Sequence, residues 1–339
     1  MTELYGQRIQ TTVQTEYLPF VVDTILNSNV LFQRVVRAAK KWNGRTLRVP
    51  VKVSKNTTGT SFRGFDTFSV AATDNRQFME FTPSFYQITC ALPGDELSVA
   101  DTEDKVLDLM KLTIQSDTED MADDLGTIFY ADGTGNGSKD PLGLAALVDD
   151  GTSVSTIGGL SRSTYTTLAG TVTASGGTLT LAKVDTLWIN LTSGAQKPTA
   201  FYGTEAIFNF YGQLLRPQER INKDVGTMKG LSGGTGFTAL AYNGKPLLMD
   251  EKCTSGVLFA LNEDYIDWYA LPYFGAKPVA YKSQIEGNDY DAPIGLGFSW
   301  SDWIIPANSG SVVGHIYFGG QFITTNPKRQ GKLTGITGI

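Results

Sequence analysis

The apolar residues between Glu103 and Tyr130 recur with helical spacing and predict one long helix over 103–130. The stretch holds no glycine or proline before Gly126, and at 1.5 Å per residue the helix is roughly 42 Å long. At 100° per residue its apolar residues fall within one narrow arc: Leu107, Met110, Ile114, Met121, Leu125 and Ile128. Asp101 or Thr102 can cap its start, and the glycine-rich run at 132–141 cannot continue it.

The opposite face of this helix is expected to carry Leu109, Leu112 and Tyr130, where a surface helix is usually polar. The segment 101–124 also has two lysines and nine acids: Asp101, Glu103, Asp104, Asp108, Asp117, Glu119, Asp120, Asp123 and Asp124. Its local charge is therefore about −7, against −6 for the whole chain. A solvated acidic face explains this charge, and so does a second face that receives a basic surface; the sequence leaves both open.

Alternation with a period of two appears inside a strongly basic segment, 30–65. That segment contains no acid and nine cations: Arg34, Arg37, Lys40, Lys41, Arg45, Arg48, Lys52, Lys55 and Arg63. Apolar and polar residues alternate over 46–54, which predicts a half-buried strand, and Pro50 confines it to an edge or a free-standing ribbon. Residues 76–82 predict the return strand of a long hairpin. Because an isolated hairpin is marginal in water, we expect it to lie on something else.

The rest of the chain alternates short strands and helices. Residues 84–92 predict a strand before the long helix, and 142–148 an apolar segment after it. Residues 151–180 read as turns and short strands. A mixed α/β lobe is expected, with helices at 182–191 and 203–215 and strands at 198–202, 242–250 and 256–261. A flexible loop is expected at 222–238. The ends are expected to be a polar arm with a short helix at 17–28, and a mostly β part, 263–339, with a strand at 311–325 and a polar, basic tail at 326–335.

Composition narrows the class of protein. Hydrophobic residues make up 41% of the chain, enough for a real core, and charged residues only 18%, below the roughly 25% of average globular proteins. The acidic balance argues against simple nucleic-acid binding. Two cysteines form no disulfide framework, and neither a signal peptide nor a membrane-spanning run is visible. Folding in a cytoplasm, without a membrane, is expected.

The candidate chemical motifs are incomplete. The run 230–236 lacks the Gly-Lys-[Ser/Thr] ending of a phosphate loop. The loop after Asp132 lacks the glutamate of a calcium loop. His315 is the only histidine, and Cys90 and Cys253 lack zinc-site spacing. The acids of the long helix spread around a rod, whereas a glycosidase needs two convergent carboxyls. We therefore expect no enzyme, no cofactor and no metal site.

The order of these elements resembles the major capsid proteins of tailed bacteriophages, which have the HK97-type fold. The strand at 46–54 and its tip resemble the extended loop (E-loop), and 103–130 resembles the spine helix. The sequence FYADGTGNG at 129–137, followed by PLGL, resembles the family's spine exit, and 326–335 resembles the end of the peripheral domain. The resemblance implies an α+β chain with five parts: an N-terminal arm (1–43), an E-loop (44–83), a peripheral P-domain (84–149), an axial A-domain (150–260) and a return to the P-domain with a C-terminal strand (261–339).

The resemblance also implies a function. Such a chain assembles as hexamers and pentamers into an icosahedral shell around phage double-stranded DNA, in the host cytoplasm, and becomes part of the virion. The implied partners are other copies of the chain, a separate scaffolding protein, a portal protein and packaged DNA contacted without sequence preference, with a decoration protein left open. Some members carry a long N-terminal scaffolding region, whereas this hairpin begins near residue 45. Either a separate scaffolding protein guides assembly, which we favour, or none is needed.

The charge pattern and the family picture lead to one hypothesis about contacts between subunits. We expect basic hairpin residues to lie near acids of an adjacent long helix: Arg45, Arg48, Lys52, Lys55 and Arg63 near Asp108, Glu119 and Asp123. Single exposed pairs contribute about 0–1 kcal/mol, but a repeated set can fix register and orientation. A covalent bond between Lys52 or Lys55 and Asn326 is a further alternative.

Three other functions remain open at this point. An encapsulin-type nanocompartment shell has the same fold but encloses cargo enzymes instead of DNA. A β-rich virion tail or surface-binding protein explains the composition but not the long helix. A glycan-active enzyme lacks a credible acid pair.

Overall fold

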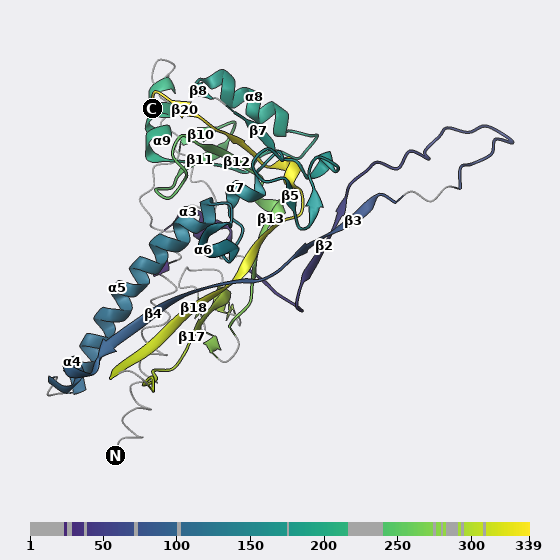
Figure 1. The fold of residues 1–339 in the computed structure, drawn as a ribbon. Helices are drawn as coiled ribbons and strands as arrows, with labels where there is room; N and C mark the ends of the chain where they lie inside the picture. The colour runs from purple at the N-terminus through teal and green to yellow at the C-terminus, as the bar shows by residue number, and fades with distance from the viewer. Residues whose placement is uncertain are drawn as a thin grey trace.

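The computed structural model describes residues 24–25, 29–36, 39–70, 74–99, 103–174, 176–215, 240–273, 276–278, 281–282, 291–292, 295–307 and 310–339 (Figure 1). Every structural statement below concerns these residues. Most of the expected N-terminal arm with its helix at 17–28, the loop at 222–238, and the expected caps Asp101 and Thr102 lie outside the described residues.

Within the described residues the predicted elements are found with small changes in bounds, except that a turn at residues 243–244 divides the single strand expected at 242–250. The helices are α3 (Val30–Arg34), α4 (Gly94–Val99), α5 (Glu103–Tyr130), α6 (Gly135–Ser138), α7 (Leu144–Leu147), α8 (Leu181–Leu191) and α9 (Glu205–Leu215). The strands of the first 203 residues are β1 (Lys40–Lys41), β2 (Leu47–Lys52), β3 (Arg76–Phe81), β4 (Ser84–Pro93), β5 (Thr156–Ile157), β6 (Leu160–Ser161), β7 (Thr171–Thr173), β8 (Gly177–Thr178) and β9 (Ala200–Gly203). The later strands are β10 (Leu240–Tyr242), β11 (Lys245–Met249), β12 (Leu258–Leu261), β13 (Ile266–Ala270), β14 (Lys277–Pro278), β15 (Tyr281–Lys282), β16 (Asp291–Ala292), β17 (Phe298–Trp300), β18 (Ser311–Thr324), β19 (Gly331–Leu333) and β20 (Ile336–Thr337).

The long helix α5 packs along a sheet built around β18. This strand pairs antiparallel with β4 over most of its length, and its opposite edge pairs with β17 and, over its last residues, with β13. Helix and strands run together through the lower half of Figure 1. The predicted apolar stripe faces the core, where Met110, Ile114, Met121 and Leu125 are buried. Phe129, near the end of the helix, contacts Phe322, Trp268 and Phe318 at centroid distances of 4.5–5.9 Å.

A second sheet forms the other lobe, at the top of Figure 1. Its strand order is β10-β11-β9-β12-β19-β7, with parallel and antiparallel pairs mixed. Helices α8 and α9 bury their apolar residues with this sheet in a core of their own, around Leu187, Phe201 and Ile207. The mixed α/β lobe expected from the sequence is therefore present.

The C-terminal strands lie in the second lobe. After β13, β17 and β18 in the first sheet, β19 pairs with β12 and β7 in the second sheet. β20 pairs with β8, and both Leu333 and Ile336 are buried in the second core. The chain leaves the first sheet at the end of β18 and finishes in the other lobe because these two apolar side chains find their core there.

Tyr130 corrects another expectation, since it does not point outward. It is buried against Phe259 at a centroid distance of 5.9 Å, and its hydroxyl donates to Asp250 Oδ2 at 2.9 Å. Helical angle alone places this side chain opposite the apolar stripe. The last turn of α5, however, is enclosed by residues of the second lobe, so both faces are covered there.

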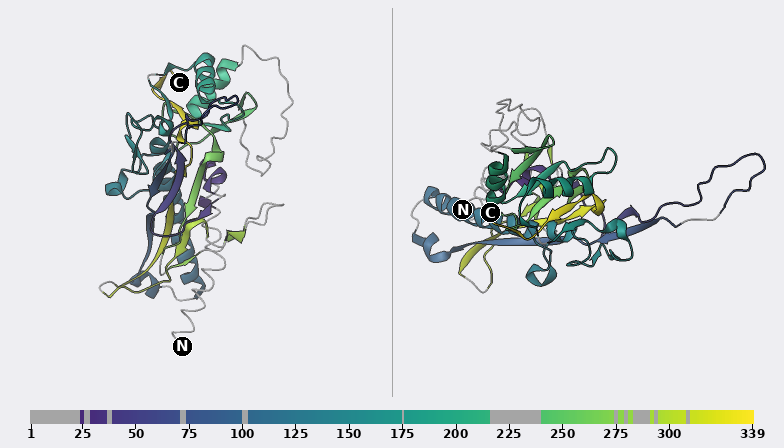
Figure 2. Two further views of the ribbon diagram at one scale, coloured as in Figure 1. Left: turned by 90° about the vertical axis from the view of Figure 1, so that its right-hand side faces the viewer. Right: turned by 90° about the horizontal axis from the view of Figure 1, so that it is seen from above.

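The hairpin projects far from both lobes. β2 and β3 pair antiparallel from Leu47–Phe81 to Lys52–Arg76, and the residues between them extend away from the body (Figure 1). The view from above in Figure 2 shows the hairpin leaving the body on the side opposite the start of α5. The outer part of the ribbon therefore lies on no other described segment of the same subunit.

Candidate functional site

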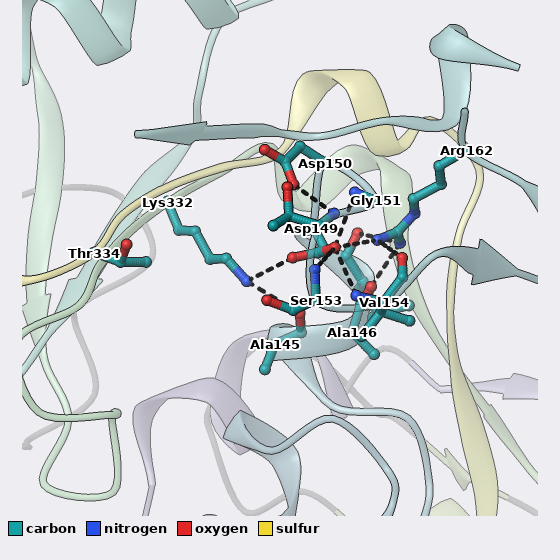
Figure 3. Close-up of polar contacts among 12 residues, drawn as sticks. Ala145, Ala146, Asp149, Asp150, Gly151, Ser153, Val154, Arg162, Lys332 and Thr334 are labelled. Carbon is teal, nitrogen blue, oxygen red and sulfur yellow. Dashed lines mark hydrogen bonds and ion pairs between the residues drawn. The ribbon is translucent and has the colours of Figure 1, made fainter. Parts of the chain in front are cut away.

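A buried charged junction ties the segment after α7 to β6 and β19 (Figure 3). Asp149 Oδ2 accepts hydrogen bonds from the N–H groups of Gly151 (2.9 Å) and Val154 (2.9 Å) and lies 3.4 Å from Arg162 Nη1. Asp149 Oδ1 lies 3.4 Å from Lys332 Nζ. The Asp149 side chain is 1% exposed, so these charges are satisfied inside the subunit.

The electrostatics of this junction suit a structural role. Burial alone raises the pKa of Asp149, but the N–H groups of Val154 and Gly151 and the two cations bring it below its ordinary value. Burial lowers the pKa of both Arg162 and Lys332. Arg162 also donates to the carbonyl of Ala146 at 2.6 Å. A carboxylate so enclosed and saturated holds three segments together and has no access to a substrate.

The N-terminal segment around α3 is fastened by a second ion pair. Arg34 donates from Nε (2.5 Å) and Nη2 (2.6 Å) to the two carboxylate oxygens of Glu263. The hydroxyls of Thr199 (3.0 Å) and Tyr202 also donate to this carboxylate. Burial raises the pKa of Glu263, but Arg34 and these hydroxyls lower it overall. The clamp joins the N-terminal segment to the second lobe.

The base of the hairpin is seated on its own subunit. Val49, Val51, Met79 and Phe81 point to one side of the ribbon and are buried. The Glu80 N–H donates to the carbonyl of Gly158 at 2.9 Å. One side of the ribbon is therefore a continuation of the body's core.

The other side of the ribbon is exposed, and we call it the outer hairpin face. It consists of Arg48, Pro50 and Lys52 on β2 and their direct partners Glu80, Phe78 and Arg76 on β3. Arg48 and Glu80 form an ion pair at 2.7 Å. Lys52 stands opposite Arg76, a like-charge arrangement that destabilises a strand pair, and Phe78 beside them is 58% exposed. Among the described residues of the subunit, no acidic or apolar partner covers the part of this face formed by Lys52, Arg76 and Phe78.

The tip beyond this face is also apolar and exposed. Phe62, Phe65, Phe68 and Val70 are all exposed, and Phe62 and Phe68 contact one another edge to face at 4.9 Å. Contiguous exposed apolar groups of this kind mark interaction sites.

The outward face of α5 carries exposed acidic residues and one exposed leucine. Asp108, Leu112, Gln115, Glu119 and Asp123 follow one another at helical spacing and form what we call the outward helix stripe. Leu112 is 64% exposed, and Asp108 and Glu119 on either side of it are exposed. Asp123 is paired with Lys252 of its own subunit.

One subunit does not bring the predicted contact residues together. Arg45, Arg48, Lys52, Lys55 and Arg63 are all exposed on or near the hairpin. The hairpin leaves the body on the side opposite the start of α5, the helix that carries Asp108. Two members of the predicted set have partners within the subunit, because Arg48 contacts Glu80 and Asp123 contacts Lys252. Sequence reasoning missed Arg76 and Phe78, although the alternation of residues 76–81 places both on the exposed side.

The other candidate residues lie in structural positions. His315 Nδ1 is 3.0 Å from the Thr89 hydroxyl on the neighbouring strand. Cys90 and Cys253 are buried, and burial raises the pKa of both thiols. The described residues contain no cluster of three or more histidine, cysteine or acidic side chains that could hold a metal ion. None of the helices in the described part is long and apolar enough to cross a membrane.

Solved structures share this fold, whereas no protein-family model and no curated protein matches the sequence. A chain of the cyanophage A-1(L) capsid asymmetric unit is 14% identical, with a TM-score of 0.64 over 91% of this chain and 92% of that one. The encapsulin of the holo-SrpI complex from Synechococcus elongatus PCC 7942 is 12% identical, with a TM-score of 0.52 over 90% and 86%. The capsid of Myoviridae phage XM1 is 12% identical, with a TM-score of 0.52 over 91% and 92%. The chain therefore shares its fold with two phage capsid chains and an encapsulin.

Proposed function

We propose that this chain, which has the HK97-type fold, is the major capsid protein of a tailed bacteriophage. Copies of it assemble as hexamers and pentamers into an icosahedral shell around double-stranded DNA. The subunit's role is structural, and its place in the virion is the capsid. In this assignment the hairpin is the E-loop, α5 is the spine helix, and the two sheets belong to the peripheral and axial domains.

The observation that carries this proposal is the combination of a shared fold over nine-tenths of the chain with a projecting hairpin. A monomeric protein gains nothing from a projecting ribbon that exposes Phe78 on its outer face and Phe62, Phe65 and Phe68 in its tip. In a shell, neighbouring copies cover such groups. The proposed partners are a separate scaffolding protein and a portal protein, and a decoration protein is an optional one.

Electron microscopy of the purified chain tests the proposal. We expect closed, hollow particles tens of nanometres across, built from rings of subunits. A preparation that stays monomeric at high protein concentration, with or without a co-expressed scaffolding protein, contradicts it.

An encapsulin-type shell is the second candidate, because the Synechococcus elongatus encapsulin has a similar fold. The contents of particles recovered from the native source separate the two functions. Nuclease-protected double-stranded DNA supports the capsid, and a folded cargo enzyme supports the nanocompartment.

A further inference from the structure

We propose that Asn43 is a site of spontaneous covalent modification in the folded protein, where the side-chain amide is lost and an aspartyl or isoaspartyl residue takes its place. The residue lies between β1 and β2, at the joint where the chain leaves the body for the hairpin. The inference concerns the chemistry of this joint and does not depend on the proposed function.

The reaction needs only the chain itself and water. The backbone nitrogen of Gly44 gives its proton to hydroxide and attacks Cγ of the Asn43 side chain. The Cγ–Nδ2 bond breaks, ammonia leaves with a proton from water, and a five-membered succinimide ring remains. Water then opens the ring at one carbonyl to give aspartate, or at the other to give isoaspartate. Glycine suits the position after the asparagine because it has no Cβ to obstruct the attacking nitrogen.

Three asparagines of this chain are followed by glycine: Asn43, Asn136 and Asn243. All three are exposed to solvent. Neighbouring sequence and exposure therefore treat them alike, and the backbone conformation is what distinguishes them.

Asn136 is protected by its backbone angles and by a carboxylate. Its φ of 51° and ψ of 35° lie in the left-handed region. This ψ places the Gly137 nitrogen nearly opposite the Asn136 Cβ across the Cα–C bond, so the nitrogen points away from Cγ. The Asn136 Nδ2 also donates to Asp140 Oδ1 at 2.8 Å. A carboxylate at this distance disfavours the negative charge that develops on the attacking nitrogen.

Asn243 is protected by a tight turn. Asn243 (φ 48°) and Gly244 (φ 73°) are the two residues between β10 and β11, whose ends pair at Tyr242 and Lys245. Positive φ at both central positions is the geometry of a type I′ turn. The Gly244 nitrogen reaches the Asn243 side chain only when this turn opens and the strand pair is broken.

Asn43 lacks these restraints. It lies outside the helices and strands and is not among the described non-glycine residues with a positive φ. Within the described part of the chain, no hydrogen bond holds its side-chain amide or the Gly44 N–H. A Cβ built on Gly44 would meet nothing nearer than the carbonyl of Thr46 at 3.8 Å, so the space around it is open.

The charge around Asn43 also favours the reaction. The segment 30–65 supplies nine cations and no acid. Positive charge stabilises a deprotonated nitrogen, whereas Asn136 has a carboxylate beside it.

The modification changes the joint that attaches the hairpin. The Trp42 N–H donates to the carbonyl of Ala270 on β13 at 3.0 Å, and the Trp42 indole N–H donates to the carbonyl of Gly44 at 2.8 Å. An isoaspartyl residue adds a carboxylate and one main-chain carbon between these two anchors. The reaction therefore alters both the charge and the length of the connection between β1 and β2.

Peptide mapping by mass spectrometry tests the inference on the purified full-length chain. The chain is incubated in mildly alkaline buffer, once folded and once unfolded in guanidinium. In the folded chain we expect Asn43 to exchange its amide for a carboxyl group roughly tenfold or more faster than Asn136 and Asn243, the rate factor of a modest difference in barrier. In the unfolded chain the three rates should converge, because each asparagine has the same following residue.

The matched control is Asn43→Gln, which keeps an amide at the joint but must close a six-membered ring, a far slower reaction. Labelling by an isoaspartyl methyltransferase measures isoaspartate directly. We expect the variant to lose the early label and to leave the slow reactions of Asn136 and Asn243 unchanged.

Three results overturn the inference. The first is a folded chain in which Asn43 reacts no faster than Asn136 and Asn243, or does not react. The second is an advantage of Asn43 that persists in guanidinium, since the fold would then not direct the reaction. The third is early isoaspartate labelling that survives in Asn43→Gln.

Discussion

The buried junction at Asp149 and the outer hairpin face both gather positive charge, but they balance it differently. At the junction, one carboxylate meets Arg162 and Lys332 within the subunit and is saturated by backbone N–H groups. On the hairpin, Lys52 and Arg76 face each other and the solvent. The difference indicates that charges completed inside the subunit hold its fold, whereas the proposed function gives the incomplete charges a role in assembly.

Removing the carboxylate of the junction should have the largest effect on subunit stability. Asp149→Ala leaves two buried cations without a counter-charge, which costs about 3–5 kcal/mol of unfolding free energy. Guanidinium unfolding of the unassembled subunit measures the loss. The control is Asp150→Ala, whose half-buried carboxylate accepts one bond, from the Thr152 N–H at 2.9 Å, and should cost about 1 kcal/mol. Equal losses for the two variants contradict the account.

The seat of the hairpin should be the next most sensitive point. An alanine Cβ at Gly158 would lie 2.5 Å from Met79 Cβ, whereas one at Gly159 meets nothing within 4 Å. Both glycines have a positive φ, so backbone strain is common to the two substitutions. We expect Gly158→Ala to cost about 1–3 kcal/mol more than Gly159→Ala in the same unfolding assay. Equal free energies of unfolding for the two variants would show that Met79 does not pack closely against Gly158.

Lowering the pH should destabilise the subunit less than removing the Asp149 carboxyl group does, because a protonated carboxyl keeps part of its hydrogen bonding. The pKa of Asp149 and that of Glu263 lie below their ordinary values. Stability from such groups is complete above the unfolded pKa of about 4 and is lost as the pH falls through the lower folded pKa. The free energy of unfolding, measured in urea between pH 5 and pH 2, should therefore fall less steeply with decreasing pH in Asp149→Asn than in the wild-type subunit. Identical slopes would show that Asp149 does not titrate in this range.

The exposed ion pair of the hairpin should have the smallest effect. Arg48 and Glu80 are both well exposed, and such pairs contribute about 0–1 kcal/mol. Arg48→Ala should therefore change the free energy of unfolding by less than about 1 kcal/mol. The variant should still form shells in electron micrographs. Loss of shells from this variant would place Arg48, rather than Lys52 and Arg76, at an interface between subunits.

The sequence predicted the elements whose pattern is local. The apolar period of α5, the alternation of β2 and the glycine-rich run after Tyr130 each depend on neighbouring residues, and their predicted bounds agree closely with the structure. The candidate surfaces were predicted in part, because exposed cations and acids are visible in the sequence as runs of charge.

Long-range partners were not predictable. Lys332 lies in a tail that reads as polar and basic, yet it is buried because β19 inserts between β12 and β7. Tyr130 reads as outward by helical angle, but the second lobe covers the end of α5. Arg48 reads as an unmatched cation because its acid, Glu80, arrives only on the return strand. In each case a segment distant in sequence decides the environment.

Disulfide cross-linking tests the central claim most directly, since the native Cys90 and Cys253 are buried. Phe78→Cys and Leu112→Cys are combined in one chain, and assembled particles are oxidised and run on a non-reducing gel. A hairpin that lies on the long helix of an adjacent subunit predicts a ladder of covalent dimers, trimers and larger rings. Particles that assemble but yield only monomers would contradict it.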